Sequence, residues 1–327
     1  MLKNIFITGG AGYVGSALVP KLIESGFKVT VLDLMIYGEK VLKPNKNLKI
    51  IRGDIRNEDL LKKSIVNVDT VIHLACISND PSFELNKKLG EDINFKAFEP
   101  LVKISRSSGV KRFIYASSSS VYGVKTENNV NEEMSLEPLT DYSRFKADCE
   151  KVLKKYQGTD FTTVTVRPAT VCGYAPRQRL DLVVNILTNL AYHKREITVF
   201  GGKQLRPNIH IDDMVEVYIQ IIKSPLKKIA GQIFNAGYQN LQVKKIAEIV
   251  KNIIGQDVEL SFEKTNDNRS YHISSKKIEN IIGFKPKQTI EKAVEDLKKA
   301  LDSNLLPDSL SDDRYFNIKR FENLKLK

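Results

Sequence analysis

The chain reads Asn4-Ile5-Phe6-Ile7-Thr8-Gly9-Gly10-Ala11-Gly12-Tyr13-Val14-Gly15 near its amino end. Its apolar run does not alternate with polar residues, which is typical of a strand buried on both faces of a parallel sheet. The glycines then fall where such a strand turns sharply into a helix. Glycine permits the tight turn and lets the backbone approach a diphosphate, which the N–H groups and the positive end of the helix attract.

A second apolar strand, residues 27–32, ends in Asp33, roughly 20 residues beyond the glycines, as in a dinucleotide-binding unit. A carboxylate there accepts hydrogen bonds from a free ribose 2′-hydroxyl and repels a 2′-phosphate. A P-loop is disfavoured because no Gly-Lys-Ser/Thr follows, and an ordinary glycine turn does not require the acidic residue. The pattern therefore predicts an NAD site that disfavours NADP, with contacts from Gly9, Gly12, Tyr13, Val14, Gly15 and Asp33.

Composition limits the alternatives. The chain has 327 residues, 42% of them hydrophobic, which suits one large or two smaller domains with real cores. The net charge is +12, but the lysines are scattered, so we expect an anionic substrate and neither nucleic acid nor a membrane as partner. Cys76, Cys149 and Cys172 lack metal-ligand spacing, and we expect no metal. Without a signal peptide or a membrane-length apolar run, we expect a cytoplasmic protein.

Strands and helices alternate through the first half of the chain, which predicts an α/β fold with a doubly wound parallel sheet of the Rossmann type. After about residue 170 the pattern loosens into short strands and helices. We expect an NAD-binding domain at 1–170 with some later segments returning to it, a smaller mixed α/β substrate domain at 171–305, and a C-terminal arm at 306–327 that lies on the surface or on a neighbouring subunit. The predicted elements before residue 170 are strands at 48–54, 68–75, 112–120 (running into a serine-rich end) and 161–166 and helices at 57–66, 85–108 (with a kink or boundary at Pro100) and 141–157.

Ligands bind at the carboxyl edge of an open parallel sheet. The polar loop after the fourth strand offers Ser78, Asn79 and Asp80, although Asn-Asp-Pro is also a common turn former. His73 lies inside an apolar strand and is predicted to be a core residue, and Asn94 is predicted to support the site through its amide. The other cofactor contacts expected here are Asp54, Ile55, Leu74, Ala75, Cys76, Asn94, Ser117 and Pro168.

Tyr142 and Lys146 are four residues apart on a predicted helix and so share one face. The lysine ammonium favours a nearby phenolate, which a general base requires. This spacing alone is common on helix surfaces. Ser118, however, lies at the carboxyl end of the preceding strand, and its hydroxyl can hydrogen-bond the same substrate oxygen that Tyr142 deprotonates. We therefore predict Ser118, Tyr142 and Lys146 as the catalytic residues.

Four stretches, together with Pro138, occur in a characteristic order: Gly9–Gly15, Ser117–Gly123, Tyr142–Lys146 and Arg167–Gly173. From residue 1 to about residue 300 the chain resembles the extended short-chain dehydrogenase/reductases, specifically the nucleotide-sugar epimerase/dehydratase family that includes UDP-glucose 4-epimerase. The resemblance implies that the tyrosine takes a proton from a sugar hydroxyl, usually at C4, while hydride passes to NAD. It also implies that Tyr142 and Lys146 contact the cofactor, and that two long helices pair subunits into a homodimer or homotetramer.

The same resemblance implies a nucleotide-diphosphate sugar as substrate. Arg206 matches an arginine that grips the diphosphate, and Asp267 matches an acidic residue near the nucleoside. Thr170 stands where many epimerases place asparagine, and Lys264 where relatives often carry arginine, which leaves sugar and base open. The complete set of implied substrate contacts is Ser78, Asn79, Asp80, Ser118, Ser119, Thr170, Leu182, Val183, Arg206 and Asp267.

The residues after Ser118 bear on the reaction. Family 4,6-dehydratases typically carry Asp-Glu there for the elimination of water, whereas this chain has Ser119 and Ser120; Asp80 is the one conceivable substitute. Family reductases generally prefer NADPH, which Asp33 disfavours. The remaining outcomes, a 4-epimerase and a 4-dehydrogenase that releases the keto sugar, use the same Ser118, Tyr142 and Lys146, so the residues do not choose between them. Because epimerases are frequent in the family, the resemblance favours a 4-epimerase of a nucleotide-linked hexose or heptose in polysaccharide biosynthesis, with the 4-dehydrogenase as the alternative. A non-catalytic NAD-binding regulator is disfavoured because the Tyr–Lys pair is intact.

Overall fold

The structure is a computed structural model that describes residues 2–127, 129–265, 270 and 272–325. A seven-stranded parallel sheet has the order β10-β6-β5-β4-β1-β2-β3. The order reverses between β1 and β4, and ligands bind at such a reversal in open parallel sheets. The strands are β1 (Asn4–Thr8), β2 (Lys28–Asp33), β3 (Leu48–Arg52), β4 (Thr70–His73), β5 (Arg112–Ala116), β6 (Thr162–Pro168) and β10 (Gln232–Ala236).

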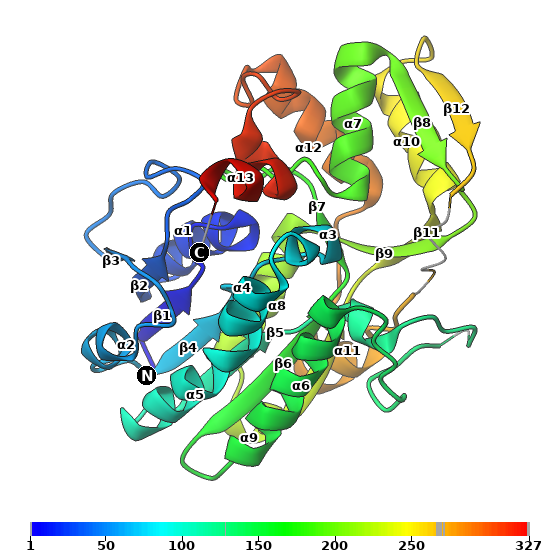
Figure 1. Cartoon of the computed structure of the whole chain (residues 1–327). Helices are drawn as coiled ribbons and strands as arrows, with labels where there is room; N and C mark the ends of the chain where they lie inside the picture. The colour runs from blue at the N-terminus through cyan, green and yellow to red at the C-terminus, as the bar shows by residue number, and fades with distance from the viewer. Residues whose placement is uncertain (1, 128, 266–269, 271, 326–327) are drawn as a thin grey trace.

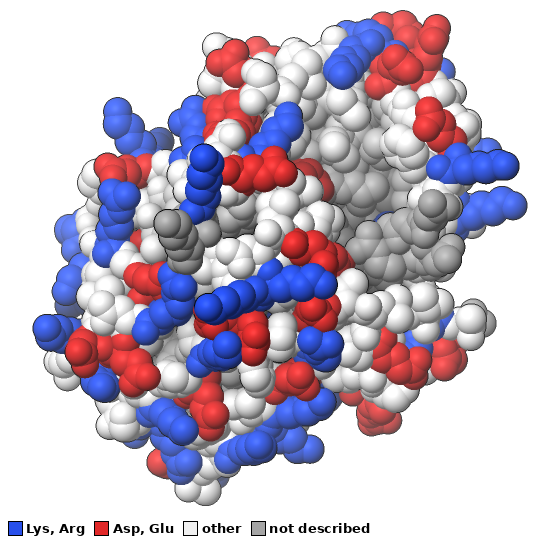
Figure 2. All heavy atoms as spheres, viewed as in Figure 1, with Lys and Arg blue, Asp and Glu red and all other residues white. Residues whose placement is uncertain are grey.

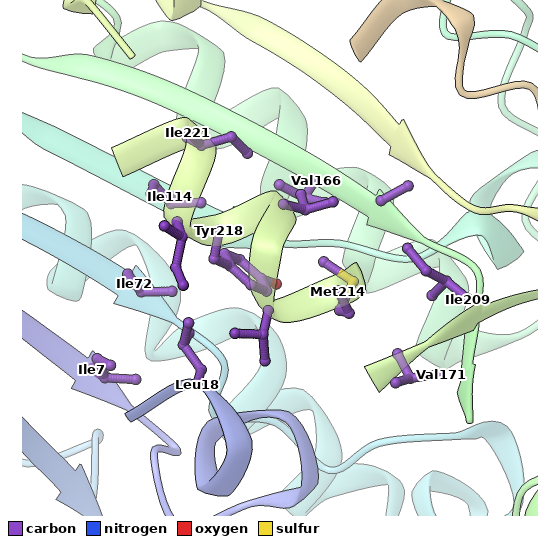
Figure 3. Packing of buried hydrophobic residues seen from close by; sticks show 14 of the residues in the cluster. Ile7, Leu18, Ile72, Ile114, Val166, Val171, Ile209, Met214, Tyr218 and Ile221 are labelled. Atoms are coloured by element: carbon purple, nitrogen blue, oxygen red, sulfur yellow. The ribbon is translucent and has the colours of Figure 1, made fainter. Parts of the chain in front are cut away.

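Helices cover both faces of this sheet, which confirms the predicted fold class. The alternating side chains of β1 divide between two cores: Ile5 and Ile7 pack with α1 (Tyr13–Glu24) and α8 (Ile211–Lys223), whereas Phe6 packs on the opposite face. The opposite face carries α2 (Glu58–Ser64), α5 (Phe98–Ser107) and α6 (Asp141–Tyr156). Figure 3 shows the first core, where Leu18, Met214, Tyr218 and Ile221 of the two helices lie over Ile7, Ile72, Ile114 and Val166 of four strands.

The long region predicted at 85–108 is helical over most of its length, but it is interrupted before Pro100 and not at it. The chain instead forms α3 (Asp80–Glu84), α4 (Lys87–Glu91), one π-helical turn (Asp92–Lys96) and then α5. Pro100 lies in the first turn of α5, where the N–H that proline lacks has no helical partner to lose. The irregularity therefore precedes the proline, and it places Asn94 in the interior with 4% of its surface exposed.

A smaller region packs beside the sheet and appears at the upper right of Figure 1. Helices α7, α10 and α12 share a hydrophobic core with β8, centred on Val184, Ile246 and Val294. Late segments also return to the large sheet, because β10 pairs with β6. The elements of the smaller region are β7 (Thr170–Cys172), α7 (Val183–Lys194), β8 (Glu196–Phe200), β9 (Leu205–His210), β11 (Gln239–Gln242), α10 (Val243–Ile254), β12 (Glu259–Glu263) and α12 (Ile290–Asp302). The described residues also form the short helices α9 (Leu226–Ile229) and α11 (Lys276–Ile282) and a 3₁₀ helix at Ser119–Tyr122.

The final segment folds back on its own chain. It forms a 3₁₀ turn (Asp313–Tyr315) and α13 (Asn317–Leu324), which packs against α3. The sequence does not predict this contact. Lysines and arginines are interspersed with acidic residues over the face drawn in Figure 2, consistent with scattered charge. Within the described ranges, no helix is long and apolar enough to cross a membrane.

Candidate functional site

A cavity of about 390 Å³ opens at the carboxyl ends of the central strands, where the strand order reverses. Most of the site residues predicted from the sequence line it. They are Gly9, Gly12, Tyr13, Val14, Gly15, Asp33, Asp54, Ile55, Leu74, Ala75, Cys76, Ser78, Asn79, Asp80, Ser117, Ser118, Ser119, Tyr142, Lys146, Pro168, Thr170 and Leu182. The alternation of strands, loops and helices therefore brings these residues from eight separate segments of the chain to one cavity.

The glycine turn leaves bare backbone at the amino end of α1. A Cβ on Gly9, whose φ is +73°, would lie 2.6 Å from the Ala75 nitrogen, and one on Gly15 would lie 2.5 Å from the Gly10 oxygen. Side chains at these positions would force β1, β4 and α1 apart. Gly12, the N-cap residue of α1, offers no side-chain cap, so the amino end of the helix faces the cavity with its N–H groups available to an anion.

Asp33 is fixed at the carboxyl end of β2. Its carboxylate accepts hydrogen bonds from the backbone N–H of Ala11 at 2.9 Å and of Met35 at 2.8 Å. Burial raises the pKa of the Asp33 carboxyl group, although the two hydrogen bonds by themselves lower it. A carboxylate has lone pairs beyond the two used here. The carboxylate at this place and the open helix end fit the ADP half of a dinucleotide.

Helix α6 presents Tyr142 and Lys146 to the cavity. Thr140 caps the helix in a reciprocal arrangement with Ser143, so Tyr142 falls in the first turn and Lys146 one turn later. Lys146 is 5% exposed, and its Nζ donates to the carbonyl oxygen of Ala116 at 2.7 Å. The same Nζ lies 5.8 Å from the centre of the Tyr142 ring. The shared helix face predicted from the spacing is confirmed.

The serines that follow β5 have different hydrogen-bond partners. Ser118 accepts a hydrogen bond from the Ser120 N–H at 3.1 Å, and the two hydroxyls are 2.8 Å apart. Ser117 instead donates to Glu150 on α6 at 2.5 Å. Ser118 and Tyr142 therefore reach one cavity from two different elements, and the hydroxyl of Ser120 joins them there.

Two polar residues near the site are structural. The Asn94 amide accepts from the Ile77 N–H at 2.8 Å and donates to its carbonyl at 2.9 Å, which holds the loop that carries Ser78. Asn94 does not line the cavity and supports it instead. His73 is 3% exposed, lies 2.7 Å from the Thr8 hydroxyl, and has its pKa lowered to about 3 by burial. It is a neutral core residue, as predicted.

Two predicted substrate contacts do not line the cavity, and a third falls outside the described residues. Arg206 is on β9 with its Nη1 donating to the Leu205 carbonyl at 3.0 Å, and it does not line the cavity. Val183 is the first residue of α7 and follows the cavity-lining Leu182. Asp267 lies outside the described residues. Their contacts with a substrate stay predictions.

The sequence analysis missed two arginines and part of the final segment. Arg177 and Arg179 line the cavity although they are 4% and 8% exposed. Both arginines follow β7 closely in the sequence. Two cationic residues in the loop after a strand could have indicated an anion site from the sequence alone. Arg179 donates to Asp181 at 2.6 Å and to Ser78 at 3.0 Å. Asn317 and Phe321 of α13 also line the cavity, and nothing in the local sequence indicates it.

Comparisons with known proteins agree with this site. Residues 5–237 match the model of the NAD dependent epimerase/dehydratase family. The chain is 27% identical to a UDP-glucose 4-epimerase of Lactobacillus helveticus over 87% of this chain and 92% of that one. It is 27% identical to the dTDP-D-glucose 4,6-dehydratase of Mus musculus over 91% of this chain and 89% of that one.

The fold also matches a solved structure of UDP-glucose 4-epimerase with UDP-glucose from Thermotoga maritima. The TM-score is 0.82 and the identity 26%, covering 91% of this chain and 99% of that one. The resemblance carried by the four sequence stretches is thereby confirmed. This chain belongs to the NAD-dependent epimerase/dehydratase family and is an enzyme whose cofactor is NAD.

Proposed function

We propose that the enzyme oxidises C4 of a nucleotide-diphosphate sugar and restores the carbon with inverted configuration, acting as a 4-epimerase. The observation that carries this proposal is the serine run. Ser119 and Ser120 follow Ser118 in the cavity, and neither offers the carboxyl group that elimination of water needs as acid or base. The uridine sugars of the 4-epimerase relatives support UDP as the first nucleotide to test.

The chain's own residues have distinct roles in this proposal. The phenolate of Tyr142 takes the proton of the C4 hydroxyl, and Ser118 hydrogen-bonds the same oxygen. The Lys146 ammonium, held by Ala116, and the positive end of α6 both favour the phenolate. When bound, NAD supplies the hydride acceptor for the oxidation and the hydride donor for the return.

A 4-dehydrogenase uses the same three residues and differs only in releasing the keto sugar. A dehydratase has one observation in its favour: Asp80 lines the cavity and accepts a hydrogen bond from Thr140, the N-cap residue of α6, at 2.5 Å. The epimerase and the dehydrogenase differ in product and not in the residues that act, whereas a dehydratase differs in both, so a product assay separates all three.

The deciding experiment incubates the purified protein with UDP-, GDP-, CDP- and dTDP-sugars and identifies the products by NMR, first without added oxidant. An epimer formed with turnover supports the proposal. A keto sugar formed once per bound NAD, then stalling until an oxidant is supplied, establishes a 4-dehydrogenase. A 4-keto-6-deoxy sugar establishes a dehydratase and makes Asp80→Asn the next variant.

The cofactor preference follows from Asp33. The variant Asp33→Asn removes the charge that accepts from the ribose and repels a 2′-phosphate, and its single amide oxygen can accept from only one of the backbone N–H groups of Ala11 and Met35. We expect NAD binding to weaken by about 10-fold to 100-fold, the value of a hydrogen bond to a charged group, while NADP binding tightens. Titrating bound NADH and NADPH fluorescence measures both affinities. The surface variant Asp59→Asn should change neither, and unchanged discrimination in Asp33→Asn would contradict the assignment.

We further propose a homodimer, or a dimer of dimers, formed through the face that α5 and α6 share. These helices pack side by side on the outer layer of the sheet. Val152 on α6 is half-buried in the free chain. Light scattering at micromolar concentration should give at least twice 37.0 kDa, and Val152→Glu should reduce it to one chain. A monomeric wild-type protein would overturn this proposal.

A further inference from the structure

The final segment of the chain reaches the cofactor cavity. Asn317 and Phe321 of α13 line the cavity, and Arg320 donates to the carbonyl oxygen of Ile36 at 2.6 Å. Ile36 follows β2, whose last residue is Asp33, so this bond attaches α13 to the adenosine side of the site. Arg320 is also paired with Asp313 at 3.1 Å, which fixes α13 to the 3₁₀ turn before it.

Asn317 joins three loops around the cavity. It is 2% exposed. Its side-chain oxygen accepts from the Tyr37 hydroxyl at 3.0 Å and from Arg177 at 2.5 Å, and its amide nitrogen donates to Ser78 at 2.9 Å. Its backbone N–H donates to the Asp181 carboxylate at 3.0 Å. One side chain of the final segment therefore connects the loops after β2, β4 and β7.

The residue that Asn317 holds is a buried cation. The guanidinium of Arg177 lies 3.5 Å from the centre of the Tyr37 ring, and its backbone N–H donates to the Ser16 hydroxyl near the amino end of α1. Its Nε is buried and has no hydrogen-bond partner among the described residues. Burial lowers the pKa of Arg177. A buried cation with an unsatisfied donor is costly, and the negative charge of an anion in the cavity that Arg177 lines would offset that cost.

The position of this arginine identifies the anion. Arg177 lies between the amino end of α1, where a dinucleotide diphosphate binds, and Tyr37, just beyond Asp33. The planar guanidinium group of an arginine can donate two parallel hydrogen bonds to phosphate oxygens. We propose that Asn317 is a positioning residue that holds Arg177 toward the ADP half of NAD, so that the C-terminal segment fastens the dinucleotide in its cavity. The proposal rests on the cofactor and is independent of which sugar reaction follows.

The test measures release of the cofactor. The full-length protein is loaded with NADH and chased with excess NAD, and the loss of bound-NADH fluorescence gives the release rate. Asn317→Ala should release NADH at least about 10-fold faster, the effect of losing about 1.4 kcal/mol. The matched control is Glu322→Ala, an exposed residue of the same helix, which should leave the rate unchanged. Affinity for ADP-ribose should fall in parallel in Asn317→Ala, and affinity for nicotinamide mononucleotide should not.

Two further variants separate positioning from general stability. Asn317→Asp keeps the oxygen that accepts from both Arg177 and Tyr37, so it should restore slow release. Arg177→Gln should release NADH as fast as Asn317→Ala, and the double variant no faster than either, because both act through one contact. Arg177→Gln also tests the proposal if Asn317→Ala does not fold. Release at the wild-type rate from folded Asn317→Ala or Arg177→Gln, or additive effects in the double variant, would overturn it. No sugar is used, so failure of the epimerase assay leaves this test intact.

Discussion

Replacing Tyr142 with phenylalanine is expected to lower sugar turnover by about 10²-fold to 10⁴-fold, the contribution of a general base. The ring remains beside Lys146, whose ammonium stays bound to the Ala116 carbonyl, so the cavity keeps its shape. Only the oxygen that takes the sugar proton is lost. Product formation followed by NMR measures the loss, and NADH fluorescence should show the cofactor bound with little change.

Helix α6 provides a matched control for this variant. Tyr156 is the last residue of the same helix, and its hydroxyl donates to Glu99 near the surface at 2.6 Å. Tyr156→Phe makes the identical chemical change away from the cavity and should keep turnover within about twofold of the wild type, since surface changes have small effects. Equal turnover in the two variants would remove Tyr142 from the mechanism. That result would also favour the alternative that the protein is a non-catalytic NAD-binding regulator.

Much of this site was predictable because its signals are local. A strand buried on both faces has a continuous apolar run, and the turn into α1 needs glycine where a Cβ on Gly9 or Gly15 would collide with backbone. The spacing of Tyr142 and Lys146 follows from the helical repeat. Parallel strands bring their carboxyl ends to one edge, so the order of the stretches along the chain was enough to bring Asp33, Ser118 and Tyr142 together.

The parts that were missed depend on distant contacts. The π-helical turn at Asp92–Lys96 has no sequence signature of its own, and it is accompanied by the bonds from Asn94 to Ile77. Asn317 meets Arg177, Ser78 and Tyr37 across 140, 239 and 280 residues of sequence. Neither its type nor its neighbours indicate those partners. Only the assembled fold shows that residues of the last helix line this cavity.

The Glu150→Ala variant is expected to lower the free energy of unfolding by about 3–5 kcal/mol, the loss that follows when one partner of a buried ion pair is removed. Glu150 and Arg167 are 6% and 3% exposed, and the guanidinium contacts the carboxylate through Nε at 3.0 Å and Nη2 at 2.6 Å. Alanine would leave the Arg167 charge and the Ser117 hydroxyl in the interior without this acceptor. Urea unfolding with linear extrapolation measures the difference.

The control comes from the same helix. Asp148 pairs with Lys151 at 2.8 Å, but that lysine is 71% exposed, so Asp148→Ala should cost less than about 1 kcal/mol. Glu150 also joins α6 to the ends of β5 and β6 through Ser117 and Arg167, next to Ser118. Glu150→Gln, which keeps the shape but loses the charge, should therefore lower turnover while NADH still binds. A cost below about 1 kcal/mol for Glu150→Ala would mean that the buried pair does not stabilise the fold. Unchanged turnover in Glu150→Gln would mean that the pair does not position Tyr142 relative to Ser118.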